Sequence, residues 1–97
     1  MTAFVYILRC SDGGYYVGST RSSLEARVAE HNAGTFRGYT WSRRPVELVF
    51  HESFEKITDA IAAERQLKGW SRAKKEALIN GNTAVLQQAA KRRTGFS

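Results

Sequence analysis

Two apolar stretches on either side of a tight-turn signal constrain the N-terminal part of this chain more than any other feature. Residues 3–9 are almost all apolar, β-branched or aromatic, which is typical of a strand covered on both faces and therefore central in its sheet. Residues 11–14 have the sequence Ser-Asp-Gly-Gly, and Asp and Gly tolerate the positive φ angles that tight turns require. Residues 15–20 are therefore predicted to return as the second strand of a β-hairpin.

This hairpin has two possible registers, and they give its tyrosines different roles. A three-residue loop pairs Tyr6 with Gly18 and Leu8 with Tyr16, so that the two tyrosines share one face of the sheet. A loop longer by one residue pairs Arg9 with Tyr16 and places the tyrosines on opposite faces. In the first register the two tyrosines can form one site. In the second they pack in separate parts of the core, and packing is the commoner role of hairpin tyrosines.

A first helix is predicted directly after the hairpin. Ser22 and Glu25 have the Ser-x-x-Glu spacing of a capping box, and the helix should run to about His31. Gly34 is a suitable helix stop. Residues 35–45 contain polar residues, Gly and Pro, and are predicted to be mostly irregular.

A third strand and two further helices complete the predicted fold. Residues 46–54 form the strand. Three of its apolar side chains are expected on one face: Val46, Leu48 and Phe50. Thr58 can cap a second helix that runs to about Trp70, and residues 71–79 form a third. This order predicts an α+β domain with a small three-stranded antiparallel sheet flanked by helices.

Length and charge limit the domain organisation and the partners. The 97 residues are expected to form one domain over residues 1–82, which residues 83–97 extend with a short helix and a basic tail. The formal net charge of +6 favours a polyanionic partner. The sequence contains one cysteine, no signal-peptide pattern and no apolar run of membrane-spanning length, so we expect a soluble cytoplasmic protein.

Two polar residues of the first predicted helix lie towards its apolar side. Arg27 and His31 are four positions apart and share a helix face. His31 lies almost in line with the apolar Leu24, and Arg27 flanks it. Without further context the two residues fit an arginine and a hydrogen-bonded histidine at the edge of the core.

Glu64 is a charged residue near the apolar side of the second predicted helix. It lies within or beside the apolar stripe, where an unpaired carboxylate would be costly. An ion pair with Lys68 or with Arg27 would explain it structurally. A metal ion would explain it functionally, because Mg²⁺ often binds through one or two carboxylates together with water and substrate phosphate.

Taken in order, these residues resemble the GIY-YIG nuclease superfamily, and in particular its small single-domain prokaryotic branch. The ordered set consists of Phe4-Val5-Tyr6, Tyr16-Val17-Gly18, Arg27 followed by His31, and Glu64. The likeness runs from about Phe4 to Ile79 and includes the stretches VYIL, CSDG, LEARVAEHNAG, SRRPVELV and SRAKKEALI. Phe4 and Val5 replace the glycine and isoleucine of the first motif, but neither position supplies a catalytic side chain.

The resemblance implies metal-dependent hydrolysis of a nucleic-acid phosphodiester, and it implies that Tyr6 and Tyr16 share the active face. Tyr16 matches the candidate general base, and Tyr6 matches a tyrosine that positions water or phosphate. Arg27 matches the arginine that steadies phosphate charge, and His31 a position for proton transfer or phosphate contact. Glu64 matches the single carboxylate that binds Mg²⁺ or Mn²⁺.

Aromatic and basic residues outside this set are candidate contacts for nucleic acid. Their mixture suits stacking on unpaired bases and contact with phosphates, although a solvated basic surface would have the same composition. The candidates are Tyr39, Trp41, Arg43, Arg44, Arg72, Lys74 and Lys75. Asn80 lies in the region where many family members carry a site asparagine, but its local sequence matches poorly and we assign it no role.

The sequence therefore predicts a metal-dependent DNA endonuclease that acts on single-stranded or structured DNA, in DNA repair or recombination. The first alternative is a catalytically inactive module that binds DNA or RNA. The second is an adaptor that docks on a partner protein of a repair system. The presence of all five expected site residues favours the endonuclease.

Overall fold

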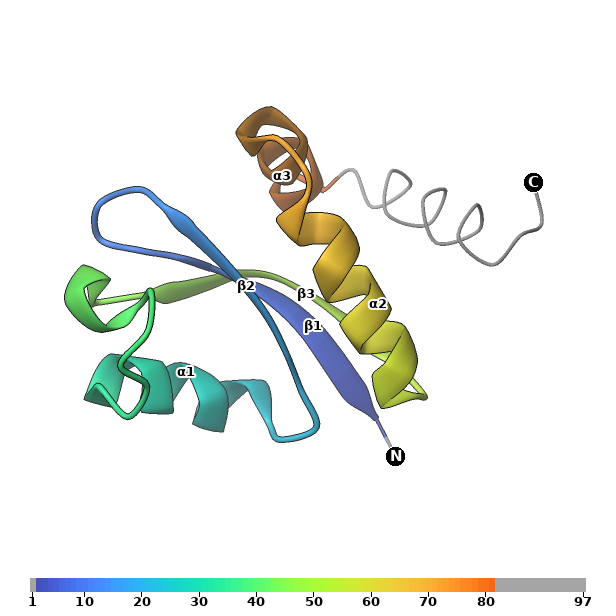
Figure 1. Ribbon diagram of the computed structural model, residues 1–97, viewed down its shortest axis with the longest axis horizontal. Helices are drawn as coiled ribbons and strands as arrows, with labels where there is room; N and C mark the ends of the chain where they lie inside the picture. Colours follow the sequence, from blue (N-terminus) through green and yellow to red (C-terminus); the bar gives the residue numbers. More distant parts are fainter. Residues whose placement is uncertain (1, 82–97) are drawn as a thin grey trace.

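The computed structural model describes residues 2–81, which form a three-stranded antiparallel sheet with helices on both of its faces (Figure 1). The elements in chain order are β1 (Ala3–Arg9), β2 (Tyr15–Thr20), α1 (Leu24–Ala33), the short 3₁₀ helix η1 (Trp41–Arg43), β3 (Glu47–Phe54), α2 (Ile57–Lys68) and α3 (Arg72–Ile79). The α+β prediction is confirmed. The predicted C-terminal extension, residues 83–97, lies outside the described residues.

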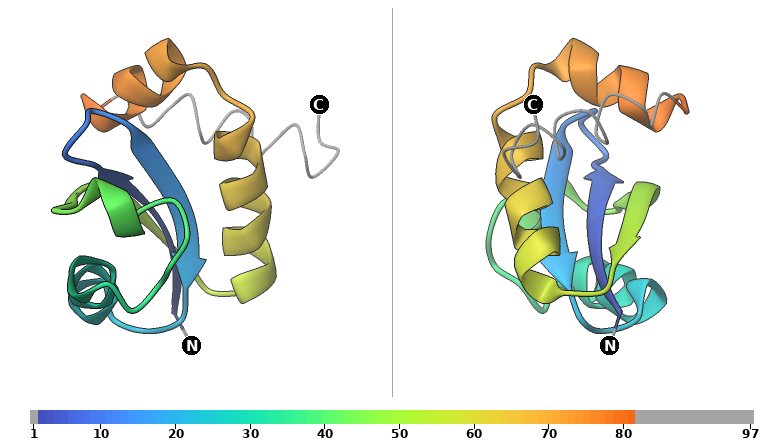
Figure 2. Two further views of the ribbon diagram at one scale, coloured as in Figure 1. Left: turned by 60° about the vertical axis from the view of Figure 1, so that its left-hand side comes forward. Right: turned by 90° about the vertical axis from the view of Figure 1, so that its right-hand side faces the viewer.

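The sheet has the strand order β2-β1-β3, so β1 is central, as its sequence predicts. Side chains alternate between the faces of β1, and each face has its own apolar cluster. Figure 2 shows the sheet between α1 on one face and α2 on the other. The α1 side contains Tyr6, Leu8, Cys10 and Val46. The α2 side contains Val5, Ile7, Val17, Phe50, Ala63, Leu67, Trp70 and Leu78. None of the helices in the described part has the length and hydropathy needed to cross a membrane.

The β1–β2 hairpin adopts the three-residue loop. Tyr6 pairs with Gly18, and Leu8 pairs with Tyr16. Gly13 has a φ of +85°, in the left-handed region that such a loop requires. Tyr6 and Tyr16 therefore share the face of the sheet that α1 covers.

The third strand differs from the sequence prediction at its centre. The register between β1 and β3 shifts at a β-bulge, where Val49 is an extra residue between the pairings of Leu48 and Phe50. Leu48 packs on the α1 side, whereas Phe50 lies in the core on the α2 side. The prediction that Val46, Leu48 and Phe50 share one face was wrong, because strict alternation stops at a bulge.

Two predicted helix starts are also displaced. Ser23, and not Ser22, caps α1, and its hydroxyl accepts a backbone N–H of the first turn. The residue before α2 is Lys56, so Thr58 lies inside the first turn and does not cap it. Gly34 ends α1 with a φ of +80°, as predicted.

Gly18→Ala tests the close approach of Tyr6 to β2. A Cβ at Gly18 would lie 2.6 Å from the Tyr6 hydroxyl, so the ring would have to move in a tightly packed place. We expect the free energy of unfolding in urea to fall by about 1–3 kcal/mol, which is typical of overpacking. Gly38→Ala is the matched control, because a Cβ there meets nothing within 4 Å. Equal stability of the two variants would contradict this contact.

Candidate active site

A buried pair, Tyr6 and His31, lies between β1 and α1. The hydroxyl oxygen of Tyr6 lies 3.3 Å from Nε2 of His31, and each residue is only 2% exposed. The other ring nitrogen, Nδ1, lies 2.8 Å from the hydroxyl of Thr40, in the segment that precedes η1. The imidazole is therefore held at both nitrogens.

Burial moves the titration of both groups away from their charged forms. It lowers the pKa of His31, and the positive charge of Arg27 lowers it further. Burial raises the pKa of Tyr6, and Tyr16 and Glu64 act in the same direction, while Arg27 acts against them. A neutral phenol thus faces a neutral imidazole near neutral pH, and their hydrogen bond places no charge in the buried site.

Tyr16 completes an aromatic group on the same face. The centre of its ring lies 5.0 Å from that of His31 and 6.3 Å from that of Tyr6. Tyr39 stacks on Tyr16 with the ring centres 6.2 Å apart. Tyr16 is half-buried, whereas Tyr6 is fully buried. Tyr16 is therefore the more accessible of the two motif tyrosines.

Arg27 borders this group. Its guanidinium donates to the hydroxyl of Thr20 at 3.0 Å and approaches the Glu30 carboxylate at 3.7 Å. It also lies 5.2 Å from the ring centre of Phe36. With 26% of the side chain exposed, the guanidinium is fixed by neighbours and still reachable from solvent.

Glu64 lies on α2, and its carboxylate is bound on both sides. One oxygen accepts from the Ser19 hydroxyl at 2.5 Å, and the other pairs with the Lys68 ammonium at 2.6 Å. The ion pair with Lys68 is thus one of the two structural explanations that the sequence left open. Within residues 2–81 the carboxylate makes no ion pair with Arg27.

Glu64 lies across the edge strand β2 from the tyrosine group. Its partner Ser19 follows Gly18, and the Tyr6 hydroxyl lies over Gly18 from the opposite face of the sheet. The carboxylate charge is near enough to contribute to the raised pKa of Tyr6. The five residues of the ordered motif therefore flank β2, with Glu64 on its α2 side and the other four on its α1 side.

Glu64 is the residue of this group that could hold a metal ion. No group of three or more His, Cys, Asp or Glu side chains gathers within the described residues, so a protein cage is not present there. A single carboxylate suits Mg²⁺, which keeps several waters and takes further oxygens from a phosphate. The competing Lys68 side chain is 54% exposed and flexible, so the residues present fit a one-carboxylate site in which the cation replaces the ammonium.

The candidate nucleic-acid contacts fall into two groups on opposite faces. The first lies beside the tyrosines, in the segment around η1, which Figure 1 shows in green near the hairpin tip. Arg43 lies 4.1 Å from the ring centre of Tyr39 and pairs with Asp12 at 3.0 Å. Arg44 lies 5.3 Å from the ring centre of Trp41, which is 39% exposed.

The second group, on α3, does not lie near Tyr6 and Tyr16. Arg72 pairs with Glu76 at 3.3 Å and lies over the ring of Tyr15 at 4.8 Å. Lys74 lies 5.3 Å from the ring centre of Trp70. Lys75 follows on the same helix. These residues lie on the α2 side of the sheet.

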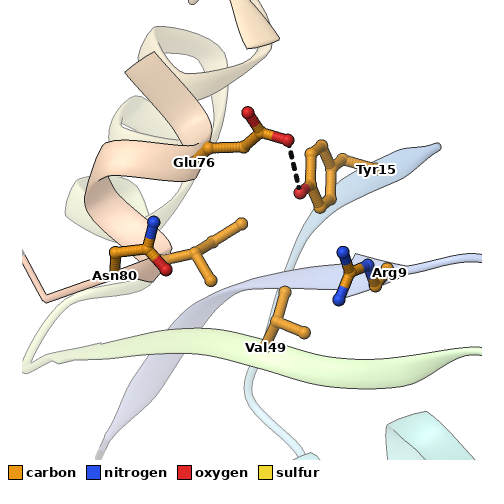
Figure 3. A pocket seen from close by; sticks show the side chains of 6 residues that line it. Arg9, Tyr15, Val49, Glu76 and Asn80 are labelled. Atoms are coloured by element: carbon orange, nitrogen blue, oxygen red, sulfur yellow. Dashed lines mark hydrogen bonds between the residues drawn. The ribbon is translucent and has the colours of Figure 1, made fainter. Parts of the chain in front are cut away.

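Tyr15 and Asn80 lie on that side too. Figure 3 shows Tyr15 pointing towards α3, where its hydroxyl donates to Glu76 at 3.1 Å. Asn80 lines the same pocket, which has a volume of about 160 Å³. The structure does not bring Asn80 to the tyrosine group, and Tyr15 serves packing, as the register predicts.

Several residues that support the site were missed by sequence reasoning. Ser19, Thr20 and Thr40 hold Glu64, Arg27 and His31 in turn. Asn32 ties α1 to the start of β3, because its side-chain amide donates to the Val46 carbonyl at 3.0 Å and accepts from the Val46 N–H at 2.7 Å. Short polar residues of this kind have no spacing pattern, so the sequence contained no signal for them.

This constellation coincides with a known family. The model of the GIY-YIG catalytic domain matches residues 2–77, which is most of the chain and includes all five motif residues. The protein belongs to the GIY-YIG family. That membership indicates a nuclease domain, for which nucleic acid is the substrate.

Several similar proteins carry the name UPF0213. One from Halobacterium salinarum is 50% identical over 75 residues, which cover 77% of this chain and 96% of the relative. One from Bacillus pumilus is 42% identical over 76 residues, or 78% of this chain and 76% of the relative. The solution NMR structure of the UPF0213 protein BH0048 from Bacillus halodurans has a TM-score of 0.54 at 34% identity, covering 94% of this chain and 96% of that one.

The lowered pKa of His31 predicts a pH-dependent stability. As the pH falls, the unfolded chain takes up a proton at this histidine at about pH 6.5, before the folded protein does. The His31 contribution is therefore complete above that pH, and the free energy of unfolding falls as the pH decreases below it. His31→Gln should remove this part of the slope in urea unfolding measured from about pH 8 to pH 5.

His51→Gln is the control for this measurement. His51 pairs with Tyr6 across β1 and β3, but its side chain is exposed, lies beside Phe4 and makes no hydrogen bond to Tyr6 or His31 within residues 2–81. This variant should keep the part of the slope that His31→Gln is expected to remove. If His31→Gln also kept that slope, His31 would not be a buried neutral imidazole.

Proposed function

We propose that this protein is a metal-dependent endonuclease that hydrolyses phosphodiester bonds of DNA, with single-stranded or structured DNA as its substrate. One observation carries the proposal: strand β2 gathers the five residues of the ordered motif from four elements. They are Tyr6, Tyr16, Arg27, His31 and Glu64. Family membership supports the reaction class.

In the proposed reaction the two tyrosines have different tasks. Tyr16 is half-buried beside the imidazole, so we assign it the contact with the attacking water, as general base. Tyr6 is fully buried and lies 3.3 Å from Nε2 of His31. We assign Tyr6 and His31 to the orientation of this water and to proton movement behind it.

Arg27 and Glu64 handle the charge of the phosphate. The planar guanidinium of Arg27 matches two phosphate oxygens, and its bond to Thr20 fixes it before substrate binds. Glu64, held by Ser19, would bind the cation. A bound Mg²⁺ or Mn²⁺ would supply Lewis-acid stabilisation of the developing charge.

Exposed aromatic side chains with neighbouring guanidinium groups favour unpaired bases as the ligand. Tyr39 and Trp41 are 42% and 39% exposed. Arg37 lies 5.1 Å from the ring centre of Trp41, which Arg44 also approaches. Aromatic faces stack on any unpaired base, and the basic groups contact the backbone. The same features would serve RNA.

A second candidate function is that of a binding module without catalysis. The observation that favours it is the Lys68 ammonium on the Glu64 carboxylate, where the cation would have to bind. The endonuclease requires that metal and substrate displace this lysine. A cleavage assay separates the two functions.

We expect the purified protein to cleave end-labelled single-stranded or branched DNA with Mg²⁺ or Mn²⁺ and not with chelator. Tyr16→Phe should lower the single-turnover rate at least about 100-fold, the usual scale for losing a general base. Glu64→Gln should also lower this rate, because the amide is a weaker ligand for the cation. Tyr15→Phe and Glu76→Gln are matched controls, because both residues lie on the α2 side of the sheet, where Tyr15 bonds Glu76 of α3. They should cleave like the unmodified protein.

Binding to every DNA without metal-dependent cleavage of any would reject the endonuclease in favour of the binding module. Cleavage that survived Glu64→Gln would place the metal elsewhere.

Trp41→Ala tests the stacking surface separately from catalysis. With chelator present, its affinity for a fluorescent single-stranded DNA should fall by about 1–3 kcal/mol, the scale for one stacked base. Affinity for a duplex should fall less. Ile61→Ala is the control, because Ile61 is similarly exposed at 36% on α2. Unchanged single-strand affinity of Trp41→Ala would remove Trp41 from the binding surface.

A further inference from the structure

Thr40 is a buried polar residue for which neither the family motif nor the proposed reaction gives a role. It is 1% exposed and precedes the first residue of η1. Its hydroxyl lies 2.8 Å from Nδ1 of His31, and this is the one hydrogen bond of that hydroxyl among residues 2–81. Its neighbour Tyr39 stacks on Tyr16, so this short segment touches both the histidine and the accessible tyrosine.

Two hydrogen bonds connect Thr40, His31 and Tyr6. Three protons are available for them: one on the Thr40 alcohol, one on the neutral imidazole and one on the Tyr6 phenol. If Nε2 carries the ring proton, Thr40 donates to Nδ1 and the ring donates to Tyr6, so the phenol proton of Tyr6 has no described acceptor. If Nδ1 carries it, Tyr6 donates to Nε2 and the ring donates to Thr40, so the alcohol proton is left over. Leaving the weaker donor unbonded costs less, and a phenol is a stronger donor than an alcohol.

We propose that Thr40 is a positioning residue, which accepts the Nδ1–H of His31 and thereby presents the Nε2 lone pair to the hydroxyl of Tyr6. When a proton moves, the O–H bond of Tyr6 breaks and an Nε2–H bond forms. The products would be a phenolate, whose charge Arg27 offsets against burial, and an imidazolium that keeps its Nδ1–H on Thr40. The catalytic consequence rests on the proposed function, whereas the tautomer does not.

The surroundings of the ring favour this assignment. The titratable or charged groups around it are Tyr6 from β1, Tyr16 from β2, and Arg27 and Glu30 from α1. Arg27 and burial disfavour the imidazolium, and Glu30 opposes them weakly. An acceptor at Nδ1 is therefore the fixed group that stabilises the proton on the ring once it has arrived.

The tautomer can be read directly from ring ¹⁵N signals in the long-range ¹H–¹⁵N spectrum. The chain has two histidines, so His51→Gln leaves His31 as the single imidazole. In this background we expect neutral His31 to carry its proton on Nδ1, and Thr40→Ser to preserve it. Thr40→Val removes the acceptor, so the Nε2–H form should gain population and the pKa of His31 should fall.

Two results would overturn the proposal: an Nε2–H tautomer in the parent, or an unchanged tautomer and pKa in a folded Thr40→Val. If Thr40→Val did not fold, the tautomer of the parent would decide alone.

Cleavage rates add a readout that a merely structural role would not give. Thr40→Ser should retain kcat, whereas Thr40→Val should lower kcat with little change in KM and shift the pH profile. A rise in KM alone would contradict the positioning role. Absence of cleavage by the unmodified protein would reject the proposed function, whereas the tautomer measurement would still test the role of Thr40.

Discussion

The pairing of Tyr6 with Gly18 is the contact on which the rest of the site depends. Because Gly18 has no side chain, the Tyr6 hydroxyl can lie directly over the edge strand, within reach of His31 from α1. A shift of one residue in this register would move Tyr16 to the other face of the sheet. The tight turn at residues 11–14 therefore determines which side chains face α1 further along the hairpin.

Strand β2 joins two layers that the sheet would otherwise separate. The tyrosines and His31 belong to the α1 side, whereas Glu64 comes from α2 on the other side. The two sides lie back to back on β2, where Ser19 faces Glu64 on the α2 side and Gly18 faces Tyr6 on the α1 side. The Glu64 carboxylate and the buried Tyr6–His31 pair thus lie on opposite faces of one edge strand.

Much of the fold and of the site could be predicted from the sequence, where the signal was local or periodic. The central strand, the Gly34 stop and the side of α1 that carries His31 follow from hydrophobic pattern and spacing. The bulge at Val49 and the cap at Ser23 depend on tertiary packing and were misplaced. Local rules allowed two registers of the hairpin. The resemblance of the ordered motif favoured the one that pairs Tyr6 with Gly18, and the structure has this register. The hydroxyl of Thr40 had no signal, because its role exists only once the chain has folded around His31.

The central claim is that Glu64 binds a divalent cation at the edge of β2, beside the tyrosine group. Titration of Mn²⁺ into the ¹⁵N-labelled protein tests it most directly, because the paramagnetic ion broadens amide signals near its site. We expect the earliest broadening at residues 18–20 and around Glu64, and its loss in Glu64→Gln. Broadening centred elsewhere, or unchanged in Glu64→Gln, would contradict the claim.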